Sequence, residues 1–543
     1  MSSPSGPSSA SGPSGRFGPS GPPVDEGPSG PVARPAAAPD AGSPPPARAP
    51  FAALPVGAVA AALLALELGF SGRYGYHRDE LYFLVAGQHL AWGYPDQPPL
   101  VPAVARAMSA AFPHSLVALR APMASAVAAV VVMTGLLARE FGARRGGQTL
   151  AAGGTAVSAI VLALGHTLST ATFALLAEVL LLWMLVRLLR SGDGRWWPLI
   201  GVLAGIGLMA DPLVGAILLG AGVGILVSGP RRVLWSPWPA LGAAVAAGLW
   251  LPYLLWQARH GWPELAVSRS IAAGGSGTSL PRGLFPPMQA VVVSAFLTPV
   301  WIAGLVRLLR ARELRVFRSL GWAYLVLVVL FTALAGKTYY LVALYPVLLA
   351  AGAQPTLDWV RRRPERAGRR RALLAAAVLL SLVDVVVSLP VVPAAMLHAT
   401  PITALDEPAG ETVGWPVYVR QVAAVYRALP VAERSGAIVL TRNYGEAGAV
   451  DYFGPALGLP PAYSGHNGFY DWGPPPDSAR TAVVIGFQHQ PGLLRGAFGD
   501  CRQVARLENG LHLDNDEQHT PLWICTGRRA SWPALWPGFK TLG

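Results

Sequence analysis

The sequence has little charge, few cysteines and almost no lysine. Charged residues make up 13% of its 543 residues and hydrophobic residues 52%, a balance that lies outside the range of soluble globular proteins. The two cysteines, Cys501 and Cys525, are not in a Cys-x-x-Cys arrangement, so the common zinc and redox motifs are excluded. The composition therefore predicts an integral membrane protein.

The formal net charge is +13, which in a soluble chain would suggest nucleic acid as a partner. Here the arginines fall mostly in short loops between apolar stretches, and the richest run lies between Arg361 and Arg371. Arginine in such loops sets the orientation of a membrane protein and meets anionic head groups. We therefore expect membrane lipids as partners and no nucleic acid.

Apolar stretches of about twenty residues, the length that crosses the hydrocarbon, predict about eleven transmembrane helices within residues 51–395. Their approximate ranges are 51–71, 115–138, 147–165, 168–189, 196–210, 212–229, 237–257, 285–306, 318–336, 338–355 and 372–393. Residues 1–50, rich in Pro, Ser, Gly and Ala, are predicted to form a disordered tail. The positive-inside rule places the N-terminus in the cytoplasm and the C-terminal segment outside it.

Residues 396–543 are less hydropathic and differ in pattern. Short β-rich runs at 436–441, 481–487 and 521–525 alternate with helical stretches such as 416–429, which predicts a small extracytoplasmic α/β domain. On that oxidising side we expect Cys501 and Cys525 to form a disulfide. Two buried free thiols are the alternative.

The loop 72–114, after the first predicted span, is the polar stretch with the clearest chemistry. It contains the acids Asp79 and Glu80, with His77 and Arg78 directly before them. A carboxylate at the membrane surface suits a general base that removes a proton from a hydroxyl group. The alternative is an ordinary solvated acidic pair.

Three segments carry a family resemblance. The stretch from Tyr76 to Leu100, containing Asp79 and Glu80, resembles the first external loop of the dolichyl-phosphate-mannose protein mannosyltransferases and their bacterial relatives, which include the aminoarabinose transferases acting on lipid A. The segments Pro252–Pro263 and Gly336–Pro346 are similar to two further motifs of that family. The resemblance implies a polytopic membrane protein with the C-type glycosyltransferase (GT-C) fold.

The resemblance also implies roles for single residues. Asp79 is the expected catalytic base, Glu80 a supporting acid that orients neighbours, and Asp96 a residue that organises the loop or positions substrate. Charge developing on a leaving phosphate is best met by preorganised cations. The expected substrate-binding residues are His77, Arg78, Asp96, Arg259, His260, Lys337 and Tyr340.

Lys337 is one of only two lysines among 42 basic residues. In a chain so strongly biased to arginine, a lone lysine at the external end of a helix suggests that a compact ammonium is required there. A lysine that merely anchors the helix end at the membrane surface is the alternative. For Arg259 and His260 the alternative is an aromatic belt with no chemistry, because Trp256 and Trp262 flank them.

In the C-terminal segment, 443–452 and 463–467 resemble the external domain of one bacterial branch of the family. They supply four candidates for acceptor binding, Tyr444, Glu446, His466 and Asn467. Docking of this domain onto the membrane part is the alternative role.

The chain also departs from that branch. Ala174 stands where an Asp is usual, and Asp211 stands where a Lys is common. Glu178, an acid within a predicted span, is a candidate to replace the missing acid, since ionisable groups in membranes are costly and usually functional.

These observations predict an inverting membrane glycosyltransferase of the bacterial cell membrane. It would move a hexose or pentose from a polyprenyl-phosphate donor to an extracytoplasmic lipid, glycan or protein acceptor. The alternatives are a transporter or flippase of lipid-linked substrates and a catalytically lapsed family member. No cofactor is certain; a divalent cation near Asp79 and Glu80 is the one considered, and its ligands are unknown.

Overall fold

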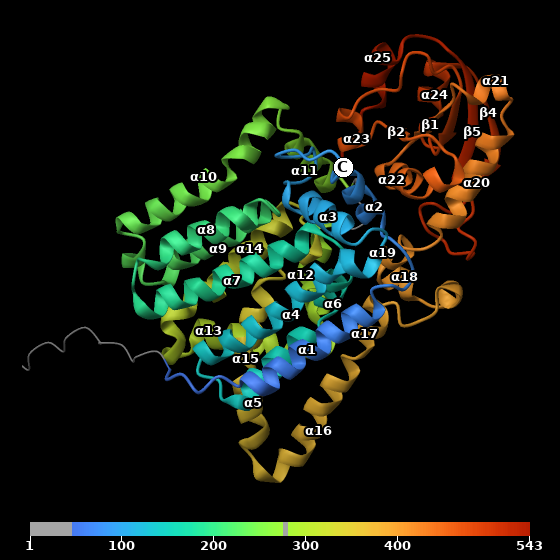
Figure 1. The fold of residues 1–543 in the computed structure, drawn as a ribbon. Coiled ribbons are helices and arrows are strands. Elements are labelled where there is room, and N and C mark those ends of the chain that lie inside the picture. The colour runs from blue at the N-terminus through green and yellow to red at the C-terminus, as the bar shows by residue number, and fades with distance from the viewer. Residues whose placement is uncertain (1–45, 275–280) are drawn as a thin grey trace, which may run out of the picture. The chain divides into compact units, whose positions relative to one another are not determined.

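The computed structural model describes residues 46–274 and 281–543. The predicted disordered tail therefore lies outside the described residues except for its last five positions. Residues 45–543 form one compact unit, so the predicted boundary near residue 396 between two separate domains stays a prediction. The unit consists of two parts (Figure 1). The larger, here called the helical part, contains the helices between Ala53 and Ser388. The smaller, the sheet-bearing part, contains the helices and all strands between Ile402 and Phe539.

The helical part follows the apolar stretches of the sequence, because a backbone within lipid must satisfy its hydrogen bonds internally. Every predicted span coincides with a helix or with a pair of helices joined at a bend. The helices are α1 (Ala53–Phe70), α2 (Arg78–Ala86), α3 (Leu100–Ala111), α4 (Leu116–Glu140), α5 (Arg145–Ala156), α6 (Ala159–His166), α7 (Thr170–Ser191), α8 (Trp196–Leu208), α9 (Leu213–Ser228), α10 (Pro237–Arg259), α11 (Pro263–Ala272), α12 (Phe285–Val293), α13 (Thr298–Arg310), α14 (Arg318–Ala333), α15 (Leu344–Arg361), α16 (Pro364–Leu380) and α17 (Val383–Ser388).

Within the described residues, 6 helices are long and apolar enough to cross a membrane, or up to 8 if each of two bent pairs is one span. The bent pairs are α5 with α6, at 59°, and the segment Arg282–Val293 with Ala295–Arg310, at 89°. Three further apolar helices, α3, α8 and α9, are shorter. The predicted count of about eleven spans stays a prediction.

The β-sheet has five strands in the order β2-β1-β3-β5-β4. Strand β1 (Ile438–Thr441) runs parallel to β2 (Ala462–Ser464) and to β3 (Ala482–Ile485), whereas β5 (Pro521–Arg528) is antiparallel to β3 and to β4 (Phe498–Arg506). Every residue of β1 and β3 is buried, as expected for central strands covered on both faces.

The helices of this part of the chain are α18 (Ile402–Leu405), α19 (Glu407–Gly410), α20 (Trp415–Ala428), α21 (Val431–Arg434), α22 (Tyr444–Phe453), α23 (Gly468–Asp471), α24 (Pro491–Ala497) and α25 (Trp532–Leu535). Cys501 and Cys525 are paired residues of β4 and β5 and form a disulfide. The disulfide joins the edge strand to its neighbour.

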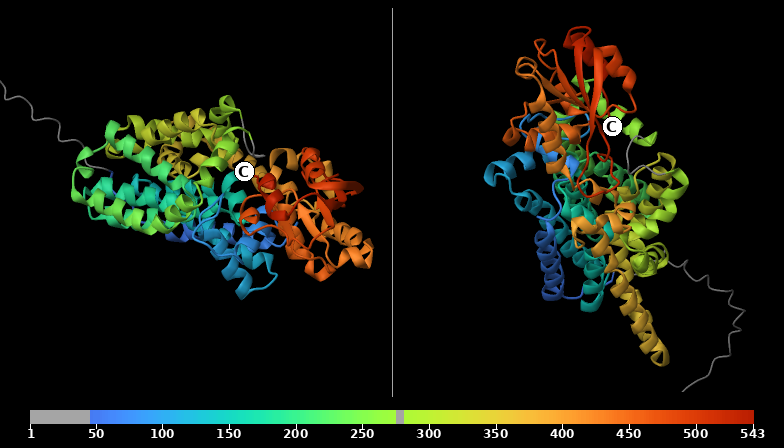
Figure 2. Two further views of the ribbon diagram at one scale, coloured as in Figure 1. Left: turned by 90° about the horizontal axis from the view of Figure 1, so that it is seen from above. Right: turned by 90° about the vertical axis from the view of Figure 1, so that its right-hand side faces the viewer.

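Helix α2 connects the helical part to the sheet-bearing part, and its buried residues share an apolar core with α3, α20 and α22. Two glycines of α22 allow the close approach: a Cβ at Gly445 would lie 2.8 Å from the Cβ of Arg78, and one at Gly448 would lie 2.9 Å from the backbone of Leu81. In both views of Figure 2 the sheet-bearing part lies at one end of the long helices. The loop predicted to carry the chemistry thus lies between the two parts.

Candidate active site

Helix α2 begins within the acidic stretch singled out from the sequence. His77 is its N-cap, and a capping box is complete: the His77 imidazole accepts from the Asp79 N–H at 3.2 Å, and Glu80 Oε2 accepts from the His77 N–H at 2.8 Å. Both carboxylates lie in the first turn, where the helix dipole favours negative charge. The local sequence therefore places Asp79 and Glu80 at one helix end, facing different surroundings.

Glu80 is fully buried and bound on both carboxylate oxygens. Arg120 of α4 grips it with two hydrogen bonds of 2.8 and 2.7 Å, and the Leu168 N–H donates a third at 3.0 Å. Burial alone raises the pKa of Glu80, but the charge and hydrogen bonds of Arg120 outweigh it and lower that pKa below its ordinary value. Both oxygens of Glu80 thus accept hydrogen bonds, and the carboxylate anchors the first turn of α2 to α4; its role as a supporting acid stays a prediction.

Arg120 is not among the residues predicted from the sequence, although the sequence contains a signal for it. It is a lone arginine inside an apolar span, and such residues are costly unless they have a role. Its guanidinium also donates to the backbone oxygens of Ser71 and Gly75, at 2.9 and 2.7 Å, and lies 3.2 Å from His166 Nε2. Behind His166 lies the buried carboxylate of Glu67, at 3.7 Å from Nδ1. A polar cluster inside the helical part therefore supports the first turn of α2.

Asp79 faces the other way, and 41% of its side chain is exposed. Its Oδ1 accepts a hydrogen bond of 2.8 Å from the Tyr444 hydroxyl of α22. Its Oδ2 lies 3.8 Å from His77 Nδ1, outside hydrogen-bond distance. Among the residues that the structure describes, one oxygen of Asp79 therefore has a hydrogen-bond donor and the other has none.

His77 and Arg78 are bound by Glu411, which no sequence motif predicts because it lies far away in the chain. Glu411 Oε2 is 2.9 Å from His77 Nε2, and its Oε1 accepts from Arg78 Nη1 at 2.7 Å. Burial opposes the charged form of each group, but the hydrogen bond from His77 and the charge of Arg78 lower the pKa of Glu411 to about 2. For His77, burial lowers the pKa, but the nearby Asp79 and Glu411 raise it overall. Arg78 also lies over the Tyr444 ring, at 5.3 Å from its centroid.

Asp96 is bound between the helical part and the sheet-bearing part. Its Oδ1 accepts from the Tyr82 hydroxyl and its Oδ2 from Asn467 Nδ2, both at 2.9 Å. Tyr82 in turn accepts from the Gly468 N–H at 3.2 Å. Burial raises the pKa of Asp96 to about 7 despite these donors. Asn467 has a φ of 48° and a ψ of −132°, a backbone conformation that residues with a side chain rarely adopt.

Of the four residues predicted to bind acceptor, only Tyr444 contacts Asp79. Glu446 is buried as the capping-box residue of α22, with Oε2 accepting from the N–H groups of Arg442 and Asn443 at 2.9 and 3.0 Å. His466 is buried against the Tyr444 ring, and its Nε2 donates to the Gly543 carbonyl oxygen at 2.6 Å. Burial lowers the pKa of His466 to about 4, so it is neutral at neutral pH. The side chains of Glu446 and His466 thus bind other parts of the protein: Glu446 caps α22, and His466 binds the Gly543 carbonyl oxygen.

Lys337 lies between α14 and α15 and is partly buried. In the described part of the chain its ammonium has no hydrogen-bond or ion-pair partner; its one direct contact is the Tyr339 ring, with its centroid at 6.0 Å. Burial lowers its pKa, and Asp79 and Asp211 lie near enough for their charges to act in the opposite direction. The structure therefore places an unpaired cation within electrostatic reach of Asp79.

Asp211, the departure between α8 and α9, lies near this group. Thr170 donates to it at 3.4 Å, and Glu178 of α7 lies near enough to interact with it electrostatically. Glu178 is buried one helical turn beyond Ala174, on the same face of α7. Tyr340 contacts Phe331 and Tyr339, with ring centroids 5.2 and 5.4 Å apart.

Arg259 and His260 lie exposed at the end of α10, where the His260 ring stacks on Trp256 at 4.0 Å. The contact of α10 with the acidic loop is made instead by Gln257, whose amide donates to the Tyr94 carbonyl oxygen at 3.1 Å. The sequence motif therefore positions a helix end against the loop, and neither Arg259 nor His260 contacts Asp79.

A divalent cation held jointly by Asp79 and Glu80 does not fit this geometry, because both oxygens of Glu80 already accept hydrogen bonds from Arg120 and from the backbone. Among the residues that the structure describes, no group of three or more His, Cys, Asp or Glu side chains could hold a metal ion. Of these two acids, only Asp79 has an oxygen that accepts no hydrogen bond from the described residues.

Residues 96–256 match the family model described as dolichyl-phosphate-mannose-protein mannosyltransferase. The match covers Asp96 and α3 to most of α10, and it stops short of Asp79 and of the sheet-bearing part. The predicted family resemblance is confirmed. A comparison with curated proteins found no match.

Two solved structures of ArnT from Cupriavidus metallidurans share the fold. One is in the apo state and the other is bound to undecaprenyl phosphate. Each superposes with a TM-score of 0.51 at 15% sequence identity, over 87% of this chain and 97% of the ArnT chain. The similarity therefore extends over both the helical and the sheet-bearing parts.

Proposed function

We propose that this chain, a member of the dolichyl-phosphate-mannose protein mannosyltransferase-like family with the GT-C fold, transfers a sugar from a polyprenyl-phosphate donor to a hydroxyl group of an envelope lipid, glycan or protein. The ArnT structure that shares its fold is bound to undecaprenyl phosphate, which supports a polyprenyl-phosphate-linked donor. Helices that are long and apolar enough to span a membrane support access to such a lipid.

The proposal rests on a difference in burial and hydrogen bonding between two adjacent acids. Glu80 is saturated by Arg120 and backbone donors, whereas Asp79 has one oxygen held by Tyr444 and one oxygen open. A base must be positioned and must also keep a lone pair free for the proton it takes. Asp79 meets both conditions.

In the proposed step, Asp79 Oδ2 takes the proton of the acceptor hydroxyl. The hydroxyl oxygen forms a bond to the anomeric carbon while the bond from that carbon to the donor phosphate oxygen breaks. The bonding electrons leave with the polyprenyl phosphate, and in-line attack inverts the anomeric configuration. The proton remains on Asp79 until release to water.

Lys337 is the proposed partner of the leaving phosphate. Its ammonium has no hydrogen-bond or ion-pair partner among the described residues, so a phosphate oxygen would be its first. A compact point charge stabilises the phosphate more as negative charge develops on it, which favours the transition state over the ground state. Arg78 is committed to Glu411 and Asp516, at 2.7 and 3.2 Å, so we assign it to positioning.

Tyr444 links the proposed base to the sheet-bearing part. Its hydroxyl donates to Asp79, while its ring contacts both Arg78 and His466. We infer that this part helps to shape the acceptor side of the site and that it lies outside the cytoplasm, on the same side of the membrane as Asp79. The orientation follows from the positive-inside rule.

The proposal is tested with purified protein in vesicles that contain polyprenyl-phosphate sugars and an extract of envelope lipids and glycans. Mass spectrometry should find the sugar on an acceptor and free polyprenyl phosphate in equal amounts. Comparing envelope extracts from cells with and without the gene identifies sugar and acceptor together. Movement of the lipid-linked sugar across the vesicle membrane with no glycosyl product would instead support the transporter alternative.

A further inference from the structure

Helices α15 and α16 form a hairpin at the end of the helical part away from the sheet (Figure 1). A cavity of about 670 Å³ opens between this hairpin and α5. Its volume is within the range of small-molecule sites. The residues that line it include Leu150, Leu374, Ala375, Val378, Arg361 and Arg371.

The cavity exists because α16 stands away from the other helices. In the span Pro364–Ser388 only 6% of the apolar window is buried inside the protein, and no residue of α16 is buried. By contrast 67% of the corresponding window of α7 is buried. A membrane helix so weakly packed against protein must be covered by lipid, including on the face that looks toward α5.

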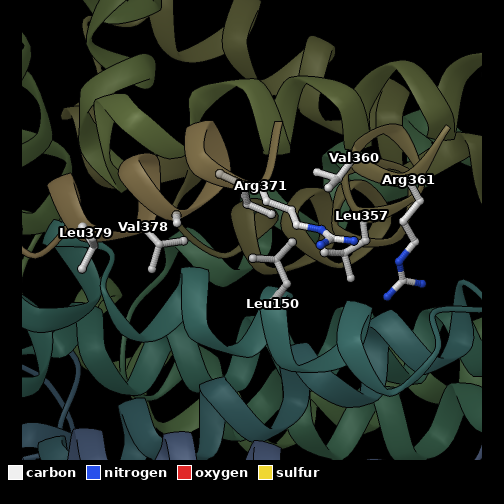
Figure 3. Close-up of a pocket in the computed structure, with 9 residues that line it drawn as sticks. Leu150, Leu357, Val360, Arg361, Arg371, Val378 and Leu379 are labelled. Carbon is white, nitrogen blue, oxygen red and sulfur yellow. The ribbon is translucent and has the colours of Figure 1, made fainter. Parts of the chain in front are cut away.

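The cavity is apolar at one end and cationic at the other. Figure 3 shows Val378 and Leu379 at one end and Arg361 at the opposite end, with Arg371 between them. Neither arginine has a hydrogen-bond or ion-pair partner within the described ranges. By comparison, Arg370, next in the chain, donates to the Trp359 carbonyl oxygen and stacks on the Trp359 ring at 4.5 Å.

We propose that this cavity binds an anionic phospholipid of the bilayer. One acyl chain would lie against Leu150, Leu374 and Val378, and the phosphate would lie between the guanidinium groups of Arg361 and Arg371. Guanidinium matches phosphate through paired N–H donors. The cavity is therefore complementary to such a lipid at both ends, in charge to its phosphate and in apolar surface to its acyl chain. This site is distinct from the one around Asp79.

The test is native mass spectrometry of the full-length protein titrated with phosphatidylglycerol or with phosphatidylcholine of the same chains. Each arginine near a lipid phosphate contributes about 1 kcal/mol, or about fivefold in affinity. Arg361→Gln/Arg371→Gln should therefore weaken phosphatidylglycerol binding by about 25-fold and leave phosphatidylcholine binding unchanged within about threefold.

The matched control is Arg366→Gln/Arg369→Gln, which removes the same charge from the same hairpin outside the cavity. It should leave phosphatidylglycerol binding within about threefold of the wild type. Equal loss in both double variants would reduce the effect to general surface charge and overturn the site. Equal wild-type affinity for the two lipids would also overturn it.

Two further measurements test whether the apolar wall contributes to binding in addition to the contacts with the phosphate. Ala375→Trp fills the apolar end without removing a charge and should weaken binding of phosphatidylglycerol. Inorganic phosphate should not displace bound phosphatidylglycerol, because it gains nothing from the apolar wall. Displacement by inorganic phosphate, or normal lipid binding by Ala375→Trp, would contradict a lipid occupant.

Discussion

Asp79 and Glu80 are adjacent in the chain, yet they lie in opposite surroundings on the two sides of α2. On the inner side Glu80 is fully buried, and Arg120 and the backbone bind both of its oxygens. On the outer side 41% of the Asp79 side chain is exposed, and Tyr444 binds one oxygen only. Both oxygens of Glu80, in this inner cluster, are therefore satisfied by the protein, whereas one oxygen of Asp79, in the outer group, accepts no hydrogen bond from the described residues.

This difference shows how a carboxylate can be positioned by one hydrogen bond while its second oxygen accepts none from the described residues. The ion pair of Glu80 with Arg120 fixes the first turn of α2, so that Asp79 needs only one hydrogen bond of its own to be positioned. Lys337, unpaired in the described part of the chain, belongs to the outer group as well. Substitutions in the inner cluster should therefore affect folding first, and those in the outer group should affect turnover.

The largest effect is expected for Arg120→Met. It leaves the Glu80 carboxylate buried without its counter-charge, which typically costs about 3 to 5 kcal/mol. Thermal unfolding of the purified protein should show a large drop, whereas the exposed control Arg106→Met should change stability by less than about 0.5 kcal/mol. Glu80→Gln/Arg120→Met should recover part of the loss. An Arg120→Met protein as stable as the wild type would remove the distinction between the two sides.

Lys337→Ala should lower kcat by about a hundredfold or more, the usual loss for one donor to developing charge. Lys337→Arg should be clearly impaired, because a planar fork replaces a point charge. The only other lysine, Lys540, provides the control, and Lys540→Ala should transfer sugar normally. Steady-state kinetics with a polyprenyl-phosphate sugar measure all three. An Ala variant within about threefold of wild type, far short of the loss expected for such a donor, would leave Lys337 only as a helix anchor.

Tyr444→Phe should lower kcat by about tenfold while the unfolding temperature stays close to that of the wild type. The substitution removes the one hydrogen bond that positions Asp79 and keeps the ring against Arg78; a bond to a charged group is worth about 1.5 to 3 kcal/mol. Tyr452→Phe, which breaks a 2.6 Å contact with Tyr76 instead, is the control. Equal rates for the two variants would mean that Tyr444 does not position the base.

The smallest effect is the contribution of Asp96 to the pH dependence of the protein's stability. Its folded pKa of about 7 lies above the unfolded value of about 3.9, so the folded state binds more protons between these values and stability falls as the pH rises through that window. Asp96→Asn does not titrate. The variant should therefore gain in unfolding temperature relative to the wild type between about pH 4 and pH 7. If the unfolding temperatures of the wild type and of Asp96→Asn changed in parallel with pH, the pKa of Asp96 would not be raised by burial in the folded protein.

The sequence predicted the fold well where one physical rule dominates. Runs of apolar residues gave the long helices, and three β-rich runs coincide with β1, β3 and β5. Strand β4 was missed because it is a polar edge strand with mostly exposed side chains, and β2 because it has three residues. The predicted span 338–355 begins late, as α15 at Leu344, because Thr338–Leu341 form a 3-10 turn.

For the candidate site, sequence motifs identified Asp79, Glu80, Asp96 and Lys337 because their residue types are unusual beside apolar spans. The partners that decide what each acid does come from distant segments. Arg120 is 40 residues away from Glu80, and Tyr444 is 365 residues away from Asp79. No local pattern can show which carboxylate becomes saturated, so the difference between the two acids required the structure.

The most direct test of the account compares Asp79→Asn with Asp96→Asn in the reconstituted transfer assay. Asparagine keeps the shape of Asp79 but cannot take the proton, and a general base contributes about a hundredfold to ten-thousandfold. The account predicts that Asp79→Asn unfolds at the wild-type temperature and shows no measurable transfer, while Asp96→Asn keeps part of its activity. Substantial turnover by a well-folded Asp79→Asn protein would contradict the assignment of Asp79 as the base.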